Sequence, residues 1–219
     1  MVVSSKYQLL FVESELLHDK IKDYRSKGYF VIVYAHMGSM FCRYPNPSVK
    51  NTIHKLIDYG VGCIFVSHPH CVGGVYKYKE VPVFYSLGDF LMDGESFRRR
   101  RSCSVSIKIS ENKIVGWDFI PSVTGIDLQT HNPNEKEKRK IDQGIRKVTE
   151  SMSLVRMDYK KYYKYRYKFD MICHSFSTIN FIFRTKDFFA IIHSFASRLS
   201  DFRAMYKRIA IDRTNIRNG

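Results

Sequence analysis

Cysteine is scarce in this chain and is not spaced in the pairs that build disulfide frameworks or zinc ribbons. Only five of the 219 residues are cysteine, and no two of them form a C-x-x-C pair. An odd number of isolated cysteines argues against both kinds of scaffold. Cys63 and Cys103 stand inside apolar strand patterns, so we expect both to be small core residues.

Long apolar runs and two common active-site motifs are also missing. No stretch reaches the roughly eighteen uncharged apolar residues of a membrane-spanning helix, and the N-terminal residues lack the apolar core of a signal peptide. The phosphate-loop pattern G-x-x-x-x-G-K-S/T and the nucleophile pattern G-x-S-x-G do not occur. The missing motifs remove the simplest nucleotide-binding and serine-hydrolase interpretations. The missing apolar segments predict a cytoplasmic protein as encoded.

Positive charge and aromatic side chains, by contrast, are abundant. Lysine and arginine together number 36 against 21 acidic residues, which gives a formal net charge of +15. Such a charge attracts polyanions, and the candidates are nucleic acid, anionic lipid and acidic polymers. With 44% hydrophobic and 15% aromatic residues, the composition predicts a folded globule.

Helical and strand patterns alternate in the first part of the chain. Gly28 and Gly60 end two helical stretches, and Asn46-Pro47 is a typical helix start, with an asparagine cap before a proline. Continuous apolar runs after each helix predict buried parallel strands joined by a helical crossover. The expected order is helix 11–27, strand 29–35, helix 47–59 and strand 61–67.

Hairpin patterns follow, and then polar and basic segments. Residues 75–78 with 81–86 form the first expected hairpin, and 103–109 with 114–120 form the second, whose alternation leaves one face polar. We divide the chain into a folded domain at 1–126, a polar linker and charged helix at 127–152, and a basic, aromatic, helical region at 153–219.

Histidines follow both expected parallel strands. His68 and His70 flank Pro69 after the second strand, and His36 follows the first. Pro69 disfavours helical backbone at His68, so we expect an extended pair whose imidazoles point to the same side. Parallel strands end side by side, which should bring His36 close to the pair. Zinc, manganese or iron suits neutral imidazoles; phosphate binding and a turn with solvated side chains are the alternatives.

Asp89 stands after another strand, in the segment Y-S-L-G-D-F at 85–90. Three roles are open for it at the same rim: a metal ligand, a hydrogen-bond partner for a histidine, or a turn residue. The four arginines at 98–101 suit an anionic group beside such a site, or simply a solvated loop.

Residues 159–168 read Y-K-K-Y-Y-K-Y-R-Y-K. Basic residues mixed with aromatic ones suit single-stranded nucleic acid or an anionic membrane surface. An amphipathic helix, with packed tyrosines and lysines that reach water, explains the same pattern without a ligand.

Four ordered blocks of the sequence resemble the CapA family, the poly-γ-glutamate capsule synthesis proteins, which are related to calcineurin-like metallophosphoesterases. The family pattern is a strand ending in H-x-G, a helix leading to L-I-D-x-G, a strand ending in G-H-x-P-H or G-H-P-H, and then Y-S-L-G-N-F. This chain has A-H-M-G at 35–38, L-I-D-Y-G at 56–60, V-S-H-P-H at 66–70 and Y-S-L-G-D-F at 85–90. The resemblance extends over residues 29–126 and corresponds to the C-terminal half of the family domain.

The resemblance implies an α/β fold, a partial metallophosphoesterase-like α/β/β/α sandwich, followed here by the basic helical region. It also implies a divalent, dinuclear centre of manganese, zinc or iron that activates a bridging water for hydrolysis or transfer. His36 would match the isolated histidine of that centre, and His68 and His70 the terminal pair, with Asp89 behind a histidine ligand. An anionic polymer at the cell envelope, poly-γ-glutamate or a polysaccharide, is the implied partner, ahead of a membrane surface and nucleic acid.

The family pattern is incomplete in this chain. Only 28 residues precede the first matched strand, and they contain no D-x-H, G-D-x-x-D or G-N-H block. Ser67 replaces a glycine and Asp89 replaces an asparagine of the family pattern. We therefore expect a truncated domain, weakly active or inactive alone, whose exposed apolar faces need a missing N-terminal half or a homo-oligomer. The alternative is a non-enzymatic module that binds polyanions or membrane surfaces.

Overall fold

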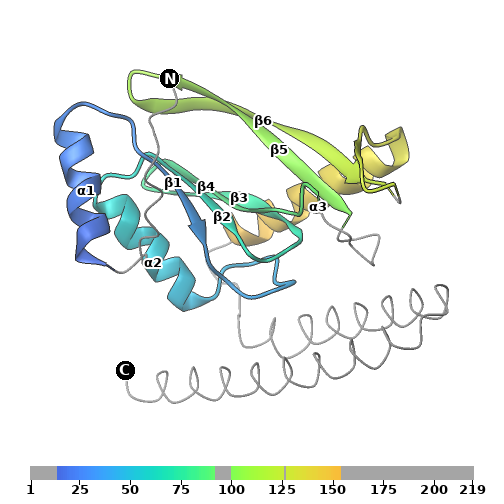
Figure 1. Cartoon of the computed structure of the whole chain (residues 1–219), viewed down its shortest axis with the longest axis horizontal. Helices are drawn as coiled ribbons and strands as arrows, with labels where there is room; N and C mark the ends of the chain where they lie inside the picture. Colours follow the sequence, from blue (N-terminus) through green and yellow to red (C-terminus); the bar gives the residue numbers. More distant parts are fainter. Residues whose placement is uncertain (1–13, 92–99, 126, 154–219) are drawn as a thin grey trace, which may run out of the picture. The chain divides into compact units, whose positions relative to one another are not determined.

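The computed structural model of the chain describes residues 14–91, 100–125 and 127–153. All of them belong to one compact unit, Met1–Met171. Its elements, in chain order, are α1 (Glu15–Ser26), β1 (Ile32–His36), α2 (Pro47–Asp58), β2 (Cys63–Ser67), β3 (Val72–Tyr78), β4 (Val81–Leu87), β5 (Arg101–Ser110), β6 (Lys113–Thr124), β7 (Thr130–His131) and α3 (Glu135–Ser153) (Figure 1).

Two sheets organise this unit. The first has the strand order β1-β2-β4-β3, and the second has the order β5-β6-β7. β1 and β2 are parallel and are joined through α2, which confirms the predicted helical crossover. Both predicted hairpins are confirmed as antiparallel pairs, β3 with β4 and β5 with β6. β4 also pairs in parallel with β2, so the first hairpin extends the parallel sheet.

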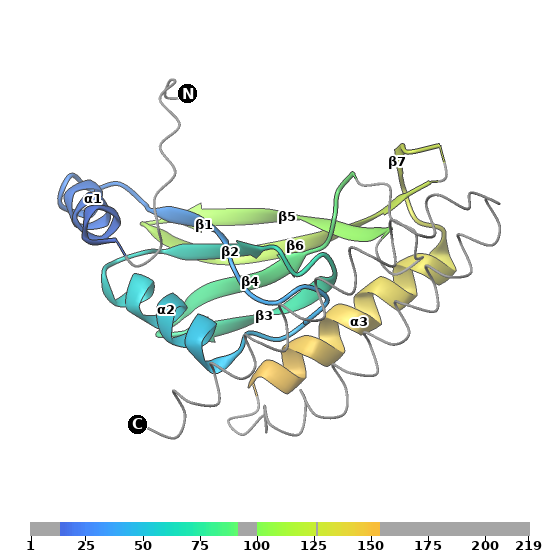
Figure 2. The ribbon, with the colours of Figure 1, turned by 60° about the horizontal axis from the view of Figure 1, so that its bottom comes forward.

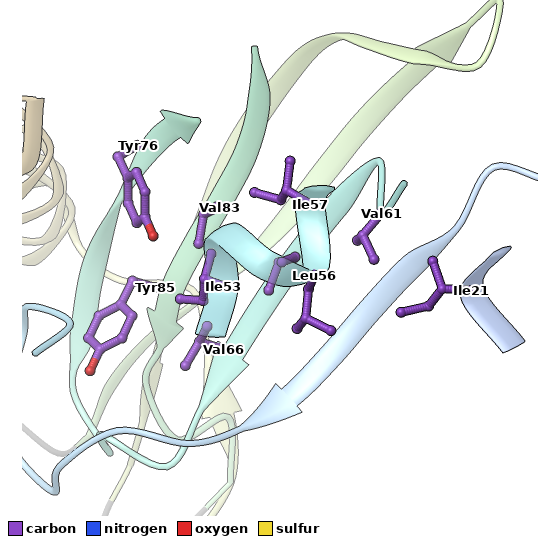
Figure 3. Close-up of a cluster of buried hydrophobic side chains, with 10 residues drawn as sticks. Ile21, Ile53, Leu56, Ile57, Val61, Val66, Tyr76, Val83 and Tyr85 are labelled. Atoms are coloured by element: carbon purple, nitrogen blue, oxygen red, sulfur yellow. The ribbon is translucent and has the colours of Figure 1, made fainter. Parts of the chain in front are cut away.

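Helices α1 and α2 pack on one face of the first sheet. The Asn46 side chain begins α2 by accepting a hydrogen bond from the Val49 N–H at 2.8 Å, as expected of an N-cap. Ile21 of α1 and Ile53 of α2 are fully buried in one apolar cluster that includes the strand residues Val66 and Val83 (Figure 3). Burial of this apolar face is the main stabilisation that α1 and α2 receive.

The second sheet packs on the opposite face of the first (Figure 2). Phe84 points to this side because strand residues alternate, and its ring centroid lies 5.6 Å from that of Trp117 and 6.0 Å from that of Phe119. Cys63 and Cys103 are buried, which confirms them as core residues. Helices together with two sheets confirm the predicted mixed α/β class and a partial metallophosphoesterase-like sandwich.

The helix α3 lies where the sequence predicts a charged helix, and it packs on this same unit. Ile141, Ile145 and Val148 are its buried residues, spaced on one helical face. The Val75 N–H donates to the Thr149 hydroxyl at 3.1 Å, so α3 covers the outer edge of β3. The basic region that follows, at 154–219, lies outside the described residues.

β1 differs from its prediction as a buried strand. Among the described residues it is an edge strand, and the side chains of Ile32 and Tyr34 are 42% and 73% exposed. The buried residues that meet the second sheet lie on β2, β3 and β4. An apolar run does not reveal whether both faces of its strand will be covered, because that depends on how far the opposing layer extends.

Candidate metal site

The three parallel strands β1, β2 and β4 end side by side in the first sheet. A histidine or an aspartate lies at or just after the C-terminal end of each strand. His36 is the last residue of β1, His68 directly follows β2, and Asp89 follows β4 by two residues. The register pairs His36 with Ser67, which places the turn after β2 beside the end of β1. We call His36, His68, His70 and Asp89 the histidine rim.

Within the histidine rim, two imidazoles approach each other directly. His36 Nε2 lies 3.1 Å from His68 Nδ1, and the ring centroids of His68 and His70 are 5.7 Å apart. The 3.1 Å between His36 Nε2 and His68 Nδ1 fits an N–H···N hydrogen bond. It is also close to the roughly 3.3 Å between two nitrogen ligands that each lie about 2.0–2.1 Å from a tetrahedral zinc. The pair is thus arranged to share either a proton or an ion.

Two histidines of the rim are oriented through their second ring nitrogen. Asp89 Oδ1 lies 2.7 Å from His70 Nδ1, and Ser67 Oγ lies 3.2 Å from His36 Nδ1. Metal-binding histidines commonly bond a carboxylate or another oxygen in this way, which fixes the ring and its tautomer. The remaining Asp89 oxygen, Oδ2, is buried and has no hydrogen-bond partner among the described residues. Sequence reasoning identified Asp89 but gave Ser67 no role.

Unusual backbone conformations surround the rim. Phe41, His68, His70 and Ser86 have φ angles of 59°, 97°, 53° and 63°. The prediction of an extended His68–His70 pair is therefore wrong: the chain turns sharply as it leaves β2, although the two rings stay near each other. Left-handed backbone at non-glycine residues costs on the order of 1–3 kcal/mol each and is concentrated at functional sites.

A buried tyrosine lies against the turn that follows His36. Tyr85 of β4 is 0% exposed, and its hydroxyl lies beneath Gly38, in the turn that follows His36. The same turn is held by the Phe41 N–H, which donates to the Pro69 carbonyl at 2.7 Å. The sequence shows Tyr85 only as part of a strand, so its place under the rim could not be read from the pattern.

Two of the buried cysteines, Cys63 and Cys103, do not extend the rim. Burial raises the pKa of the Cys63 thiol to about 12, and burial with the nearby negative Asp142 does the same for Cys103. Both thiols therefore remain protonated at neutral pH and are poor metal ligands. Of the arginine run, Arg101 starts β5 beside Gly88, which bridges to Ser102. Arg98 and Arg99, and the Tyr/Lys stretch at 159–168, lie outside the described residues.

The fit of the rim to a metal is partial. Across residues 14–91, 100–125 and 127–153, no group of three or more His, Cys, Asp or Glu side chains has an arrangement that could hold a metal ion. The His36–His68 spacing suits two nitrogen ligands, and His70 is oriented by a carboxylate. The rim thus offers part of a coordination shell.

The chain is similar to known capsule synthesis proteins. Residues 4–94 match the family model described as "Bacterial capsule synthesis protein PGA_cap". This match includes α1, the strands β1 to β4 and the whole histidine rim. The matched part of the chain is similar to the CapA family. The predicted resemblance is confirmed, although the match begins earlier than residue 29 and ends before β5.

Two curated relatives carry the CapA name. The chain is 27% identical over 143 residues to "PGA biosynthesis protein CapA" of Bacillus subtilis (strain 168), which covers 64% of this chain and 37% of that protein. It is 28% identical over 103 residues to "Capsule biosynthesis protein CapA" of Bacillus anthracis, and this alignment covers 47% of this chain and 24% of that protein. The chain thus spans well under half the length of both CapA relatives. In the described part of the chain, no helix is long and apolar enough to span a membrane.

Proposed function

We propose that this chain acts at the cell envelope in the synthesis of a capsule polymer, and that its histidine rim is one side of a metallophosphoesterase-type metal site. The observation that carries the proposal is the 3.1 Å approach of His36 Nε2 to His68 Nδ1 at the ends of two parallel strands. Both residues lie inside the segment that matches the capsule synthesis family.

Each residue of the rim has a definite part in this proposal. His36 Nε2 and His68 Nδ1 would hold a divalent ion, while Asp89 keeps the His70 ring turned with its Nε2 available. Ser67 orients the His36 ring from the other side. A bound zinc or manganese would supply Lewis-acid chemistry toward a phosphoryl or carboxyl oxygen.

Two nitrogen ligands are fewer than a zinc site normally has. Catalytic zinc usually has three protein ligands and a water, so the proposed site needs further ligands from outside the described residues, in this chain or in a partner polypeptide. We therefore expect weak or no hydrolase activity from this chain by itself. The polymer proposed as substrate or product is anionic, as poly-γ-glutamate is, and the net charge of +15 favours its approach.

Metal retention by the purified full chain tests the proposal. The protein is stripped with a chelator, dialysed against zinc or manganese, and its metal content is measured by atomic emission. The wild type should retain metal, and His68→Ala should reduce its affinity at least about tenfold by removing one of two direct ligands. The matched control is His131→Ala, since His131 pairs with Asp127 at 2.9 Å and is not part of the rim.

Two results would contradict this function. One is a wild type that retains no more metal than His68→Ala does. The other concerns polymer: if binding of poly-γ-glutamate weakens with salt but ignores both chelator and His68→Ala, the non-enzymatic polyanion-binding alternative is favoured. A p-nitrophenyl phosphate assay on metal-loaded protein measures any hydrolytic activity directly.

A further inference from the structure

Helix α3 separates its apolar residues from its basic ones. Successive residues of an α-helix are about 100° apart, so the buried Ile141, Ile145 and Val148 lie together on one inner face. The rest of the helix surface carries five exposed basic residues, which are Lys136, Arg139, Lys140, Arg146 and Lys147. We call these five residues the α3 basic stripe.

The acidic residues of α3 do not neutralise the stripe. Glu137 accepts a backbone N–H at the start of the helix at 3.1 Å, so its carboxylate turns away from the stripe. Asp142 lies near Cys103, because after burial it is the second cause that raises the pKa of that thiol to about 12. Glu135 and Glu150 stand at the two ends of the helix. In the described part of the chain, no residue of the stripe forms an ion pair.

The like charges of the stripe repel one another. Lys136 and Lys140 stand four residues apart, a spacing at which equal charges weaken a helix. Arg146 and Lys147 follow less than two turns later, and residues 143–149 contain no acidic side chain. A helix face that meets only water gains from mixed charges. A bound polyanion would remove the repulsion along the stripe.

We propose that the α3 basic stripe binds a linear polycarboxylate along the helix. The choice of polymer rests on the proposed function. From Lys136 to Lys147 the helix rises about 16 Å, so several carboxylates of one polymer chain can reach the stripe together. Lysine and arginine bind carboxylates through charge-assisted hydrogen bonds. Each exposed contact is weak, but contacts to one polymer reinforce each other.

The side chains of the stripe favour this polymer over other anionic partners. Residues 136–147 include no aromatic side chain, whereas proteins usually hold single-stranded nucleic acid by stacking as well as by charge. A helix at a membrane surface inserts an apolar face, and the apolar face of α3 is buried in the unit through Ile141 and Ile145. A flexible polycarboxylate needs only the row of charges.

α3 also lies close to the turns of the histidine rim. A Cβ added to Gly144 of α3 would stand 2.9 Å from Arg43 Nη2, so the Arg43 guanidinium packs against the helix. Arg43 follows Phe41 by two residues, and the Phe41 N–H donates to the Pro69 carbonyl between His68 and His70. Arg43 thus adds a positive charge between the stripe and the rim, and a polymer held on α3 can extend toward the proposed metal site.

Binding of fluorescein-labelled poly-γ-glutamate to the full chain tests this surface. Fluorescence anisotropy measures the affinity over a range of NaCl concentrations. The test variant is Arg139→Gln/Arg146→Gln/Lys147→Gln, which removes three charges from the stripe and keeps good helix formers. At low salt this variant should bind about tenfold more weakly, and its affinity should depend less on salt, because fewer counterions are released on binding.

The matched control is Lys55→Gln/Lys108→Gln/Lys113→Gln. It removes the same charge at exposed positions outside α3 and should change the affinity less than about twofold, because exposed charges far from the ligand are screened. Urea unfolding should give the same midpoint for the wild type and both triple variants, which verifies that the fold is intact.

The stripe is overturned if its variant and the control bind the polymer equally well, or if the wild type binds none at low salt. His68→Ala separates this inference from the proposed function. If only the stripe variant loses affinity, the stripe stands and the metal-site function fails; if only His68→Ala does, the stripe fails and the function stands. A stripe variant that loses binding to phosphatidylglycerol vesicles, but not to the polymer, would assign α3 to a membrane surface instead.

Discussion

The hydroxyl of Tyr85 lies directly against Gly38: a Cβ added to Gly38 would stand 2.6 Å from that oxygen and 3.5 Å from Pro69 Cγ. Tyr85 comes from β4, Gly38 from the turn after His36, and Pro69 from the turn between His68 and His70. Gly38 thus lies between the buried Tyr85 ring and the turn that carries Pro69, and the two turns that present the histidines meet there.

Gly38→Ala should destabilise the fold by about 1–3 kcal/mol, because the new methyl group meets Tyr85 and because φ at Gly38 is +108°. Urea denaturation measures the change. The matched control is Gly116→Ala, where the added Cβ meets only the flexible Lys108 Cδ at 3.8 Å. Equal effects of the two substitutions would show that the Tyr85 contact has no energetic importance.

Asp89→Ala should weaken zinc binding by less than the roughly tenfold loss expected for His68→Ala, since Asp89 orients only His70, which is not one of the two direct ligands. Asp89→Asn should have the smaller effect, because the amide oxygen still accepts the bond from His70 Nδ1. Zinc titration against a fluorescent chelator compares the variants. If Asp89→Ala binds zinc as the wild type does, His70 has no part in the site.

Ile145→Ala should cost about 2–5 kcal/mol, because Ile145 is only 6% exposed and packs α3 in a buried cluster with Val72, Cys103 and Val123. Lys147→Ala, on the exposed face of the same helix, should stay within about 0.5 kcal/mol. Thermal or urea unfolding distinguishes the two. A small effect of Ile145→Ala would mean that α3 is not an integral layer of the unit.

Stability should fall as the pH drops below about 6.5, in part through His54. Burial lowers the pKa of His54 from 6.5, with a smaller contribution from Lys50, so the unfolded chain binds more protons in the window below 6.5. The loss levels off below the folded-state pKa. His54→Phe keeps a ring that stacks on Tyr78, at 3.7 Å in the wild type, and should flatten this part of the curve.

A pH profile of unfolding for the wild type and His54→Phe, from about pH 5 to pH 8, makes the comparison. Since the phenylalanine does not titrate, the two curves should converge above about pH 7 after a constant offset is removed. Parallel curves over the whole range would assign the acid sensitivity to other groups.

Local patterns predicted most of the elements. Asn46-Pro47 and Gly60 bracket α2 within a residue or two, because caps and helix stops act through neighbouring residues. The hairpins β3–β4 and β5–β6 were likewise readable from their turns and alternation. The exposure of β1 could not be predicted from the sequence. It depends on how far the second sheet extends over the first, and that sheet begins about seventy residues later in the chain.

The sequence by itself determined that His36, His68 and Asp89 would meet at one end of the sheet, because parallel strands end side by side and each residue lies at or just after the end of its strand. Only the tertiary structure decided how they meet. The left-handed turns at His68 and His70, the 3.1 Å approach of His36 to His68, and the place of Tyr85 against Gly38 rest on contacts between distant segments. Such contacts override local preference, so Pro69 could not keep its two neighbours extended.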